Sequence, residues 1–151
     1  MHSIERVTEA DLPDLLPLMR GYCDFYNVSP TDEALLTLSR ALLTDPDHEG
    51  VQLIARSADP GTPAVGFATI YWSWSTSSAA RIGVMNDLFV ADHRRGVGLA
   101  DELIAACTTE CVNRGAVELE WCTAPDNYRA QSVYDRIGGR REQWVNYSLP
   151  T

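Results

Sequence analysis

Two glycines in a short turn, directly before a helix-like sequence, are the residues of this chain whose spacing most clearly indicates a binding chemistry. The segment Arg95 to Ala100 reads RGVGLA and lies between the apolar run Leu88 to Val90 and the helical pattern Asp101 to Arg114. A strand, a glycine turn and a helix start point several backbone N–H groups at one place, where the helix dipole also favours an anion. Glycine allows the backbone to approach a ligand closely, and Arg95 adds a cationic group. The segment therefore predicts a phosphate-binding turn.

The residues around the glycines narrow the class of phosphate ligand. A P-loop needs lysine and then serine or threonine after its last glycine, whereas Leu99 and Ala100 stand there and the chain contains no lysine. A kinase or NTPase P-loop is therefore excluded. A dinucleotide fingerprint that begins at Gly96 would need glycine or alanine at position 101, which is Asp101. The dinucleotide interpretation is weak for that reason.

The remaining pattern is Arg-x-x-Gly-x-Ala, at Arg95, Gly98 and Ala100. It resembles the pyrophosphate-binding signature of the GNAT superfamily of N-acetyltransferases, which bind acetyl-CoA. A second block, NYRAQSVYDRIG at residues 127–138, is similar to the Asn…Ala…Tyr…Gly segment downstream in that family. The similarity in motif detail covers residues 82–147, and the first eighty residues agree only in the coarse order of their elements. The resemblance implies a GNAT-like fold, a mixed α/β sheet with helices on both faces, and an acetyl-CoA cofactor.

The resemblance also implies a set of cofactor-binding residues. The strand end at 88–90 would pair through its backbone with the pantetheine arm and polarise the thioester carbonyl, and Tyr134 matches the family tyrosine that protonates the CoA thiolate. Tyr134 is alternatively a packed helix tyrosine, Asn127 a helix cap and Arg94 a solvent-exposed residue. The expected cofactor-binding residues are Leu88, Phe89, Val90, Arg94, Arg95, Gly96, Val97, Gly98, Leu99, Ala100, Asn127, Ala130 and Tyr134.

An acceptor amine arrives protonated at neutral pH, so a group must accept its proton. Asp87 is our first choice, and Glu120, on the predicted neighbouring strand 117–123, is the second. Asp87 also resembles the acidic position of spermidine/spermine and related diamine acetyltransferases, which faces the cationic acceptor. Each carboxylate is alternatively a solvated surface residue or an ion-pair partner of Arg81 or Arg114.

Aromatic residues near these carboxylates are candidates for contact with an alkylammonium group. Tyr71, Trp72 and Trp74 precede the strand of Asp87, and the segment Tyr22 to Tyr26 ends the first predicted helix. Cation–π contacts are worth roughly 0.5 to 2 kcal/mol, although aromatic residues in strands are usually part of a core. The expected acceptor-binding residues are Tyr26, Trp72, Asn86, Asp87 and Trp121.

Composition limits the class of protein and of partner. The 151 residues suit one domain over residues 1–151, and a net charge of −9 disfavours nucleic-acid binding while favouring a cationic substrate. Four scattered cysteines and three histidines give no metal-ligand spacing, so we expect no metal site. No apolar run has the length of a membrane span and the start of the chain lacks a signal-peptide pattern, so we expect a cytoplasmic protein with no membrane partner.

The elements that must position these residues follow from periodicity and turn signals. Strands are expected at 3–7, 51–56, 64–74, 81–90, 117–123 and 143–149. Helices are expected after Thr8, after Ser29, from Asp101 to Arg114 and from Asn127 to Arg136, which gives the order β-α-α-β-β-β-α-β-α-β. The polar pair Asn86 and Asp87 interrupts an apolar period-two series (Ile82, Val84, Leu88, Val90), as at a bulge or a site. The apolar last strand, left bare at an edge, favours a homodimer.

Together these features predict an N-acetyltransferase that moves an acetyl group from acetyl-CoA to the primary amine of a small cationic acceptor, by direct attack in a ternary complex. No residue has the setting of a covalent nucleophile, since no histidine stands in sequence beside Cys122. Polyamine-like amines are ranked first, then amino acids or aminoglycoside-like compounds, then protein amino groups. The alternative is a catalytically silent module that binds CoA or acyl-CoA.

Overall fold

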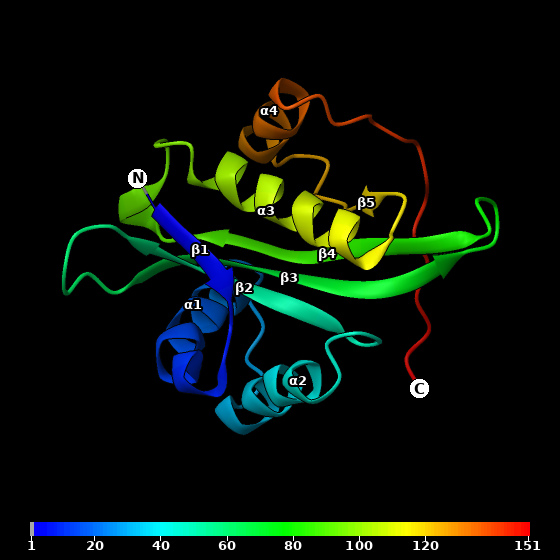
Figure 1. Cartoon of the computed structure of the whole chain (residues 1–151). Coiled ribbons are helices and arrows are strands. Elements are labelled where there is room, and N and C mark those ends of the chain that lie inside the picture. The colour runs from blue at the N-terminus through cyan, green and yellow to red at the C-terminus, as the bar shows by residue number, and fades with distance from the viewer. Residues whose placement is uncertain (1) are drawn as a thin grey trace.

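A five-stranded sheet runs through the middle of the molecule, with helices on both of its faces (Figure 1). The structure is a computed structural model and describes residues 2–151. The strands lie in the order β1-β2-β3-β4-β5; β1 to β4 are antiparallel to their neighbours, and β5 is parallel to β4. Their bounds are β1 (His2–Arg6), β2 (Gly50–Ser57), β3 (Ala64–Ser75), β4 (Ala80–Val90) and β5 (Leu119–Glu120).

The helices form two layers, with α1 (Leu12–Phe25) and α2 (Asp32–Thr44) on one face and α3 (Leu99–Arg114) and α4 (Tyr128–Arg136) on the other (Figure 1). Short 3₁₀ turns, η1 (Glu9–Asp11) and η2 (Asp92–Arg94), precede α1 and α3. The Thr31 hydroxyl accepts from the backbone N–H of Ala34 at 3.1 Å and so caps α2. No helix in the described range 2–151 is both long and apolar enough to cross a membrane.

Two hydrophobic cores, one on each face, hold the layers together. Leu103 and Cys107 of α3 are fully buried against Ile70 of β3, whereas Leu15 of α1 packs with Phe67 of β3 on the opposite face. Full burial of one such apolar side chain stabilises the fold by roughly 1.5–3 kcal/mol. Strand β3 contributes to both cores, which explains the nearly continuous apolar run of its sequence.

The predicted mixed α/β class, the first seven predicted elements and the helix predicted at 127–136 are confirmed, with ends that differ by a residue or two. Two strand predictions need correction. The strand predicted at 117–123 is reduced to Leu119–Glu120, because β5 pairs with β4 at two positions only. The strand predicted at 143–149 does not form, because the backbone of these residues makes no hydrogen bond with any strand of the described chain. The observed order therefore ends at α4.

A bulge at Asn86 determines which side chains of β4 face which layer. Thr69 of β3 lies opposite Asp87, whereas the next residue, Ile70, lies opposite Met85, so Asn86 is the extra residue on β4. Because side chains alternate along a strand, the extra residue places Asp87 on the α1 face together with Thr69. The predicted interruption at Asn86 is confirmed. The single apolar series predicted through it is split, because Leu88 packs in the core on the α3 face and the register puts Val84 on the other face.

Candidate active site

Strands β4 and β5 separate soon after they meet, and this opens the middle of the sheet. Gly83 and Val84 of β4 pair with Leu119 and Glu120 of β5, and β4 then continues to Val90 without β5 beside it. Backbone N–H and C=O groups along this free edge need hydrogen-bond partners. The last residues of β4 can therefore bind an extended, amide-containing ligand in the manner of an added strand.

The turn after β4 leads the chain into α3 and leaves its backbone accessible. Gly96 and Gly98 have φ of +82° and +83°, a left-handed conformation that side chains other than glycine rarely adopt. No other heavy atom lies within 4 Å of where a Cβ would stand at either residue. Among the described residues, the N–H groups of Gly96, Val97 and Gly98 donate to no other group of the protein.

The helix that follows this turn is firmly held in place. Leu99, the first residue of α3, is 1% exposed and packs in the core on the α3 face. The first-turn N–H groups of an α-helix have no partner within the helix, so Leu99 and Ala100 add donors to those of the glycine turn. Free donors, open space and the positive end of the helix dipole together suit a phosphate group.

The two arginines of the turn have different surroundings. Nε of Arg95 donates to the carbonyl of Val90 at 3.2 Å, and its guanidinium lies 2.9 Å from Asp92. Arg95 thus connects the turn to the end of β4, and its guanidinium does not point freely into the phosphate-binding turn. The guanidinium of Arg94 lies 3.8 Å from Asp59, in the loop between β2 and β3.

The carboxylate of Asp87 is the buried titratable group at the centre of the site. Asp87 is 9% exposed, and Nδ2 of Asn86 donates to it at 2.9 Å. Burial raises the pKa of Asp87 above its ordinary value, while the polar groups of Thr69, Tyr22 and Asn86 near its carboxylate act in the lowering direction. The balance favours a carboxylate that takes up a proton more readily than an exposed aspartate does.

Thr69 and Gln52 were not singled out by the sequence, yet they support Asp87 from the neighbouring strands. Nε2 of Gln52 donates to Oγ1 of Thr69 at 3.1 Å, and the register sets Gln52, Thr69 and Asp87 in one row across β2, β3 and β4. Gln52 and Thr69 are buried. A polar residue within each of two otherwise apolar strands was the signal that could have found them.

Tyrosines from α1 and β3 surround the mouth of the site. The Tyr22 hydroxyl donates to the backbone carbonyl of Asn86 at 3.2 Å, and the rings of Tyr22 and Tyr26 lie 4.9 Å apart. Burial, followed by the charge of Asp87, raises the pKa of Tyr71 to about 12, and the same two causes raise that of Tyr22. A carboxylate surrounded by aromatic rings is a suitable surface for an ammonium group.

Tyr134 extends from α4 toward this site. Its ring packs edge-on against Trp121 with centroids 5.3 Å apart. Burial raises the pKa of Tyr134, and the nearby Tyr26 and Cys122 act in the same direction. Asn127 accepts from the N–H of Ala130 at 3.2 Å, so its predicted role as a helix cap is confirmed.

The structure does not bring all of the predicted site residues together. Trp72 is buried in the core on the α3 face and donates to the carbonyl of Pro46 at 2.9 Å, so it lies away from Asp87. Trp74, two residues further along β3, is exposed, and the guanidinium of Arg81 lies over its ring, 4.9 Å from the ring centroid. Glu120 is exposed and pairs with Val84, which in turn pairs with Tyr71. These paired residues lie on the same face of the sheet as Asp87.

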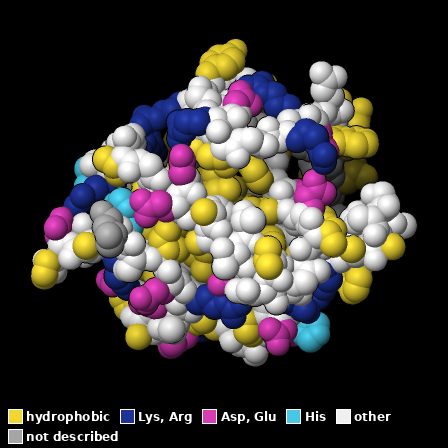
Figure 2. Space-filling view, turned by 45° about the horizontal axis from the view of Figure 1, so that its top comes forward, with side chains coloured by type: hydrophobic (Ala, Val, Ile, Leu, Met, Phe, Trp, Pro, Cys, Tyr) yellow, Lys and Arg dark blue, Asp and Glu magenta, His cyan; other side chains and the backbone are white. Residues whose placement is uncertain are grey.

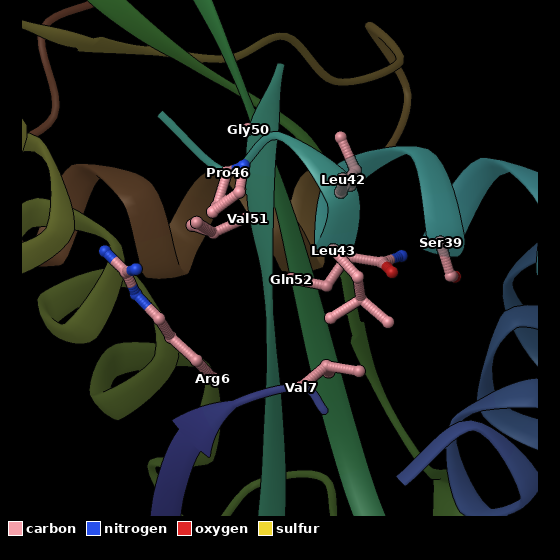
Figure 3. Close-up of a pocket in the computed structure, with 9 residues that line it drawn as sticks. All are labelled: Arg6, Val7, Ser39, Leu42, Leu43, Pro46, Gly50, Val51 and Gln52. Atoms are coloured by element: carbon pink, nitrogen blue, oxygen red, sulfur yellow. The ribbon is translucent and has the colours of Figure 1, made fainter. Parts of the chain in front are cut away.

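A small pocket elsewhere is unrelated to this arrangement. It has a volume of about 110 Å³ and lies between β1, β2 and α2, where Gln52, Leu43 and Val7 are among its lining residues (Figure 3). The phosphate-binding turn and Asp87 are not part of its lining. We assign it no role in the site.

Comparison with known proteins identifies the family. The profile of the acetyltransferase (GNAT) family matches residues 15–139. The chain belongs to the GNAT family. It is an acetyl-CoA-dependent N-acetyltransferase, and the resemblance drawn from the motifs is confirmed.

Relatives of this acetyltransferase match over nearly its whole length. It is 30% identical to the uncharacterized N-acetyltransferase YhfO of Bacillus subtilis (strain 168), over 97% of this chain and 96% of that protein. A crystal structure of a probable acetyltransferase is 30% identical, with a TM-score of 0.82 and coverage of 99% and 97%. The aminoglycoside N-acetyltransferase AAC(6')-Iy in complex with CoA is 23% identical, with a TM-score of 0.85 and coverage of 99% and 95%; it supports the fold.

The residues of this GNAT enzyme fit the cofactor that its family uses. The open left-handed turn at Gly96 and Gly98 and the start of α3 suit a pyrophosphate, and the free edge of β4 from Leu88 to Val90 suits the amides of a pantetheine arm. Bound acetyl-CoA supplies the acetyl group as an activated thioester. Burial raises the pKa of two titratable side chains, Asp87 on β4 and Tyr134 on α4.

Proposed function

We propose that this enzyme acetylates the primary amine of a small cationic acceptor by direct attack on the thioester in a ternary complex. One observation carries the proposal: a buried carboxylate, Asp87, lies on β4 with Tyr22 and Tyr71 close to it and with the ring of Tyr26 packed on that of Tyr22. Opposite charge and aromatic faces attract an ammonium group, and the same carboxylate can take its proton. The net charge of −9 favours the same class of acceptor through its long-range field.

The cofactor is held by the backbone in this proposal. The N–H groups of Gly96, Val97 and Gly98 and the start of α3 bind the pyrophosphate, and the edge of β4 from Leu88 to Val90 orients the pantetheine arm. Arg95 keeps the turn attached to the end of β4 through the Val90 carbonyl. Acetyl-CoA held in this way would bring its thioester to the end of β4, and Asp87 lies one residue before Leu88 on that strand.

Proton transfers accompany the exchange of bonds. Asp87 accepts the proton that the attacking amine loses, directly or through one water, as the new N–C bond forms. Tyr134 donates its phenolic proton to the sulfur as the C–S bond breaks. The raised pKa of Tyr134 keeps this hydroxyl protonated at neutral pH, as a donor requires. Glu120, on the same face as Asp87, is the second candidate for the proton acceptor.

The acceptor class agrees with the names of two similar proteins. One is the thialysine N-epsilon-acetyltransferase of Bos taurus, 23% identical over 91% of this chain and 83% of that protein. The other is AAC(6')-Iy, of which one structure holds a bisubstrate analogue of CoA and acetylneamine. Both names describe amines that carry positive charge near neutral pH. We rank polyamine-like and other small cationic amines first, then amino acids and aminoglycoside-like compounds, then protein amino groups.

Mass-spectrometric detection of acetylated products tests the proposal. The protein is incubated with acetyl-CoA and a panel of polyamines, amino acids, aminoglycosides and lysine peptides. Acetylation of one cationic small-amine class is the expected result, and acetylation of neutral amines or peptides alone would contradict the acceptor class. If CoA raises the melting temperature while no amine in any class is consumed, a silent CoA-binding module explains the fold better.

A further inference from the structure

The hydroxyl of Tyr22 lies between two acceptors that belong to consecutive residues of β4. It donates to the backbone carbonyl of Asn86 at 3.2 Å, and it is close enough to the carboxylate of Asp87 that each of the two groups changes the pKa of the other. A phenol has one proton to donate and lone pairs with which to accept. The hydroxyl can therefore donate to one of these acceptors while its oxygen accepts a proton from a third group.

The ring of Tyr22 is held on two sides, and this fixes the position of its hydroxyl oxygen. It packs edge-on against Phe67 of β3 with ring centroids 6.1 Å apart, and against Tyr26 with centroids 4.9 Å apart. Phe67 is 1% exposed and belongs to the core on the α1 face. Rotation about the C–O bond of Tyr22 then moves only the proton, between the Asn86 carbonyl and the Asp87 carboxylate.

Tyr22 is more accessible to an acceptor amine than Asp87 is. Asp87 is buried, whereas Tyr22 is partly exposed near the end of α1. Figure 2 shows the side that carries α3 and α4, where the middle of the surface is mostly hydrophobic side chains and uncharged atoms. A cationic acceptor is therefore favoured on the α1 side, which is the side of the Asp87 carboxylate. We expect an amine there to reach the Tyr22 hydroxyl before it reaches the carboxylate.

The groups around Tyr22 keep its hydroxyl protonated. Burial, followed by the charge of Asp87, raises the pKa of Tyr22. The other titratable groups on this face of the neighbouring elements are Cys23 and Tyr26 of α1, Tyr71 of β3 and Glu120 of β5. The cation closest to them in α1, Arg20, is paired with Asp32 of α2. Tyr22 is thus a neutral hydroxyl at neutral pH, which can pass a proton on only by accepting another.

We propose that Tyr22 carries the proton of the acceptor amine to Asp87, in place of direct contact or a water molecule. As the N–C bond forms, an N–H bond of the amine breaks and its proton binds Oη of Tyr22, while the phenolic proton of Tyr22 moves to the Asp87 carboxylate. Tyr22 remains a neutral hydroxyl, and Asp87 becomes a neutral carboxylic acid. The new hydroxyl proton then turns to the Asn86 carbonyl, away from the nitrogen, which is the hydrogen bond seen in the structure. This step rests on the proposed function, in which Asp87 is the proton acceptor.

Tyr22→Phe tests the transfer, because it removes the hydroxyl and keeps the ring on Phe67 and Tyr26. We expect kcat on the plateau above the acidic limb of the pH–rate profile to fall by about tenfold or more, with little change in the acceptor KM. The loss should shrink at high pH, where the amine arrives deprotonated. Tyr128→Phe, at an exposed tyrosine of α4, is the matched control and should leave kcat unchanged.

Two results with Tyr22→Phe would overturn the transfer. A limb that moves to higher pH while the plateau keeps its height would mean that Tyr22 only lowers the pKa of Asp87. A loss of the same size at every pH would mean that the hydroxyl only supports the bulge through the Asn86 carbonyl. The melting temperature shows whether the variant is folded.

Combination with Asp87→Asn separates this inference from the proposed function. If the proton passes through Tyr22 to Asp87, the double variant should be no slower than Asp87→Asn alone. Losses that multiply would overturn the transfer through Tyr22 and leave Asp87 as the proton acceptor. Full activity of Asp87→Asn would overturn both.

A measurement without turnover tests the contact itself. The carboxyl ¹³C NMR signal of Asp87 reports its titration, which should move to higher pH in Tyr22→Phe because a hydrogen-bond donor to the carboxylate is lost. An unmoved titration would show that the hydroxyl does not reach the carboxylate and would overturn the transfer.

Discussion

Nε2 of Gln52 donates to Oγ1 of Thr69 at 3.1 Å inside the sheet. Because the Thr69 oxygen accepts from Gln52, its own hydroxyl proton is free to be donated to Asp87 on the next strand. The three residues thus form a row of donors that ends at the carboxylate. The hydrogen-bond donors of this row partly replace the water that Asp87 loses on burial, which the apolar side chains around it cannot do.

Thr69→Val should shift the acidic limb of the pH–rate profile to higher pH. The Thr69 hydrogen bond acts to lower the pKa of Asp87, so its removal raises that pKa, and a higher pH is then needed to ionise the proton acceptor. The expected shift is about one pH unit, since a hydrogen bond to a charged group is worth roughly 1.5 kcal/mol or more. Thr69→Ser keeps the donor and should restore the original limb. An identical limb in Thr69→Val would remove Thr69 from the site.

Asp87→Asn should lose turnover that high pH partly restores, because a deprotonated amine no longer needs a proton acceptor. The comparison is kcat and KM for the acceptor across pH. A rise in the acceptor KM alone would mean that Asp87 recognises charge without accepting a proton. Asn86→Ala, at the exposed neighbouring residue, indicates how much of the effect comes from disturbing the bulge.

The stability of the same variant has a predictable dependence on pH. The folded state raises the pKa of Asp87, so the unaltered protein binds this proton more tightly when folded and loses stability as pH rises from the unfolded pKa through the folded one. Asp87→Asn lacks this titration. Its melting temperature, relative to the unaltered protein, should therefore increase between acidic and neutral pH. A difference that stays constant over this range would contradict the burial of an ionisable carboxylate.

Tyr134→Phe should reduce kcat by about 100-fold or more while the affinity for acetyl-CoA is nearly unchanged, because it removes a proton donor and keeps the ring on Trp121. Steady-state kinetics and CoA titration measure the two quantities. Tyr128→Phe changes an exposed tyrosine of the same helix and should leave both unaffected. Unchanged kcat in Tyr134→Phe would assign proton donation to another group.

Gly98→Ala should weaken CoA binding by about tenfold, because a side chain at a positive φ costs roughly 1–2 kcal/mol and displaces the turn that presents the N–H donors. Titration of CoA measures the loss. Gly61→Ala is the matched control: Gly61 has a similar φ of +77° and equally open surroundings, in the loop between β2 and β3. It should lower stability by a similar amount with no change in CoA affinity. Equal effects of both variants on CoA binding would mean that Gly98 acts through stability alone.

The sequence by itself determined the features that depend on neighbouring residues. The glycine turn, the start of α3 and the Asn127 cap involve residues a few positions apart, so their geometry follows from local backbone preferences. The strands β1 to β4 could also be predicted from the sequence, because each is an apolar run between turn signals. The family followed from the spacing of these local motifs and from little else.

Tertiary structure decided everything that depends on strand pairing. Gln52 and Thr69 reach Asp87 only because three strands meet in register, and the bulge at Asn86 selects the face on which Asp87 lies. Trp72 was predicted to contact the acceptor, but its position in the sheet places it in the core on the α3 face. Alternation shows which residues share a face of a strand, but the packing of the layers decides what each face meets. For residues 143–149 the apolar pattern was readable from the sequence, whereas a strand forms only where a sheet edge is available to pair with it.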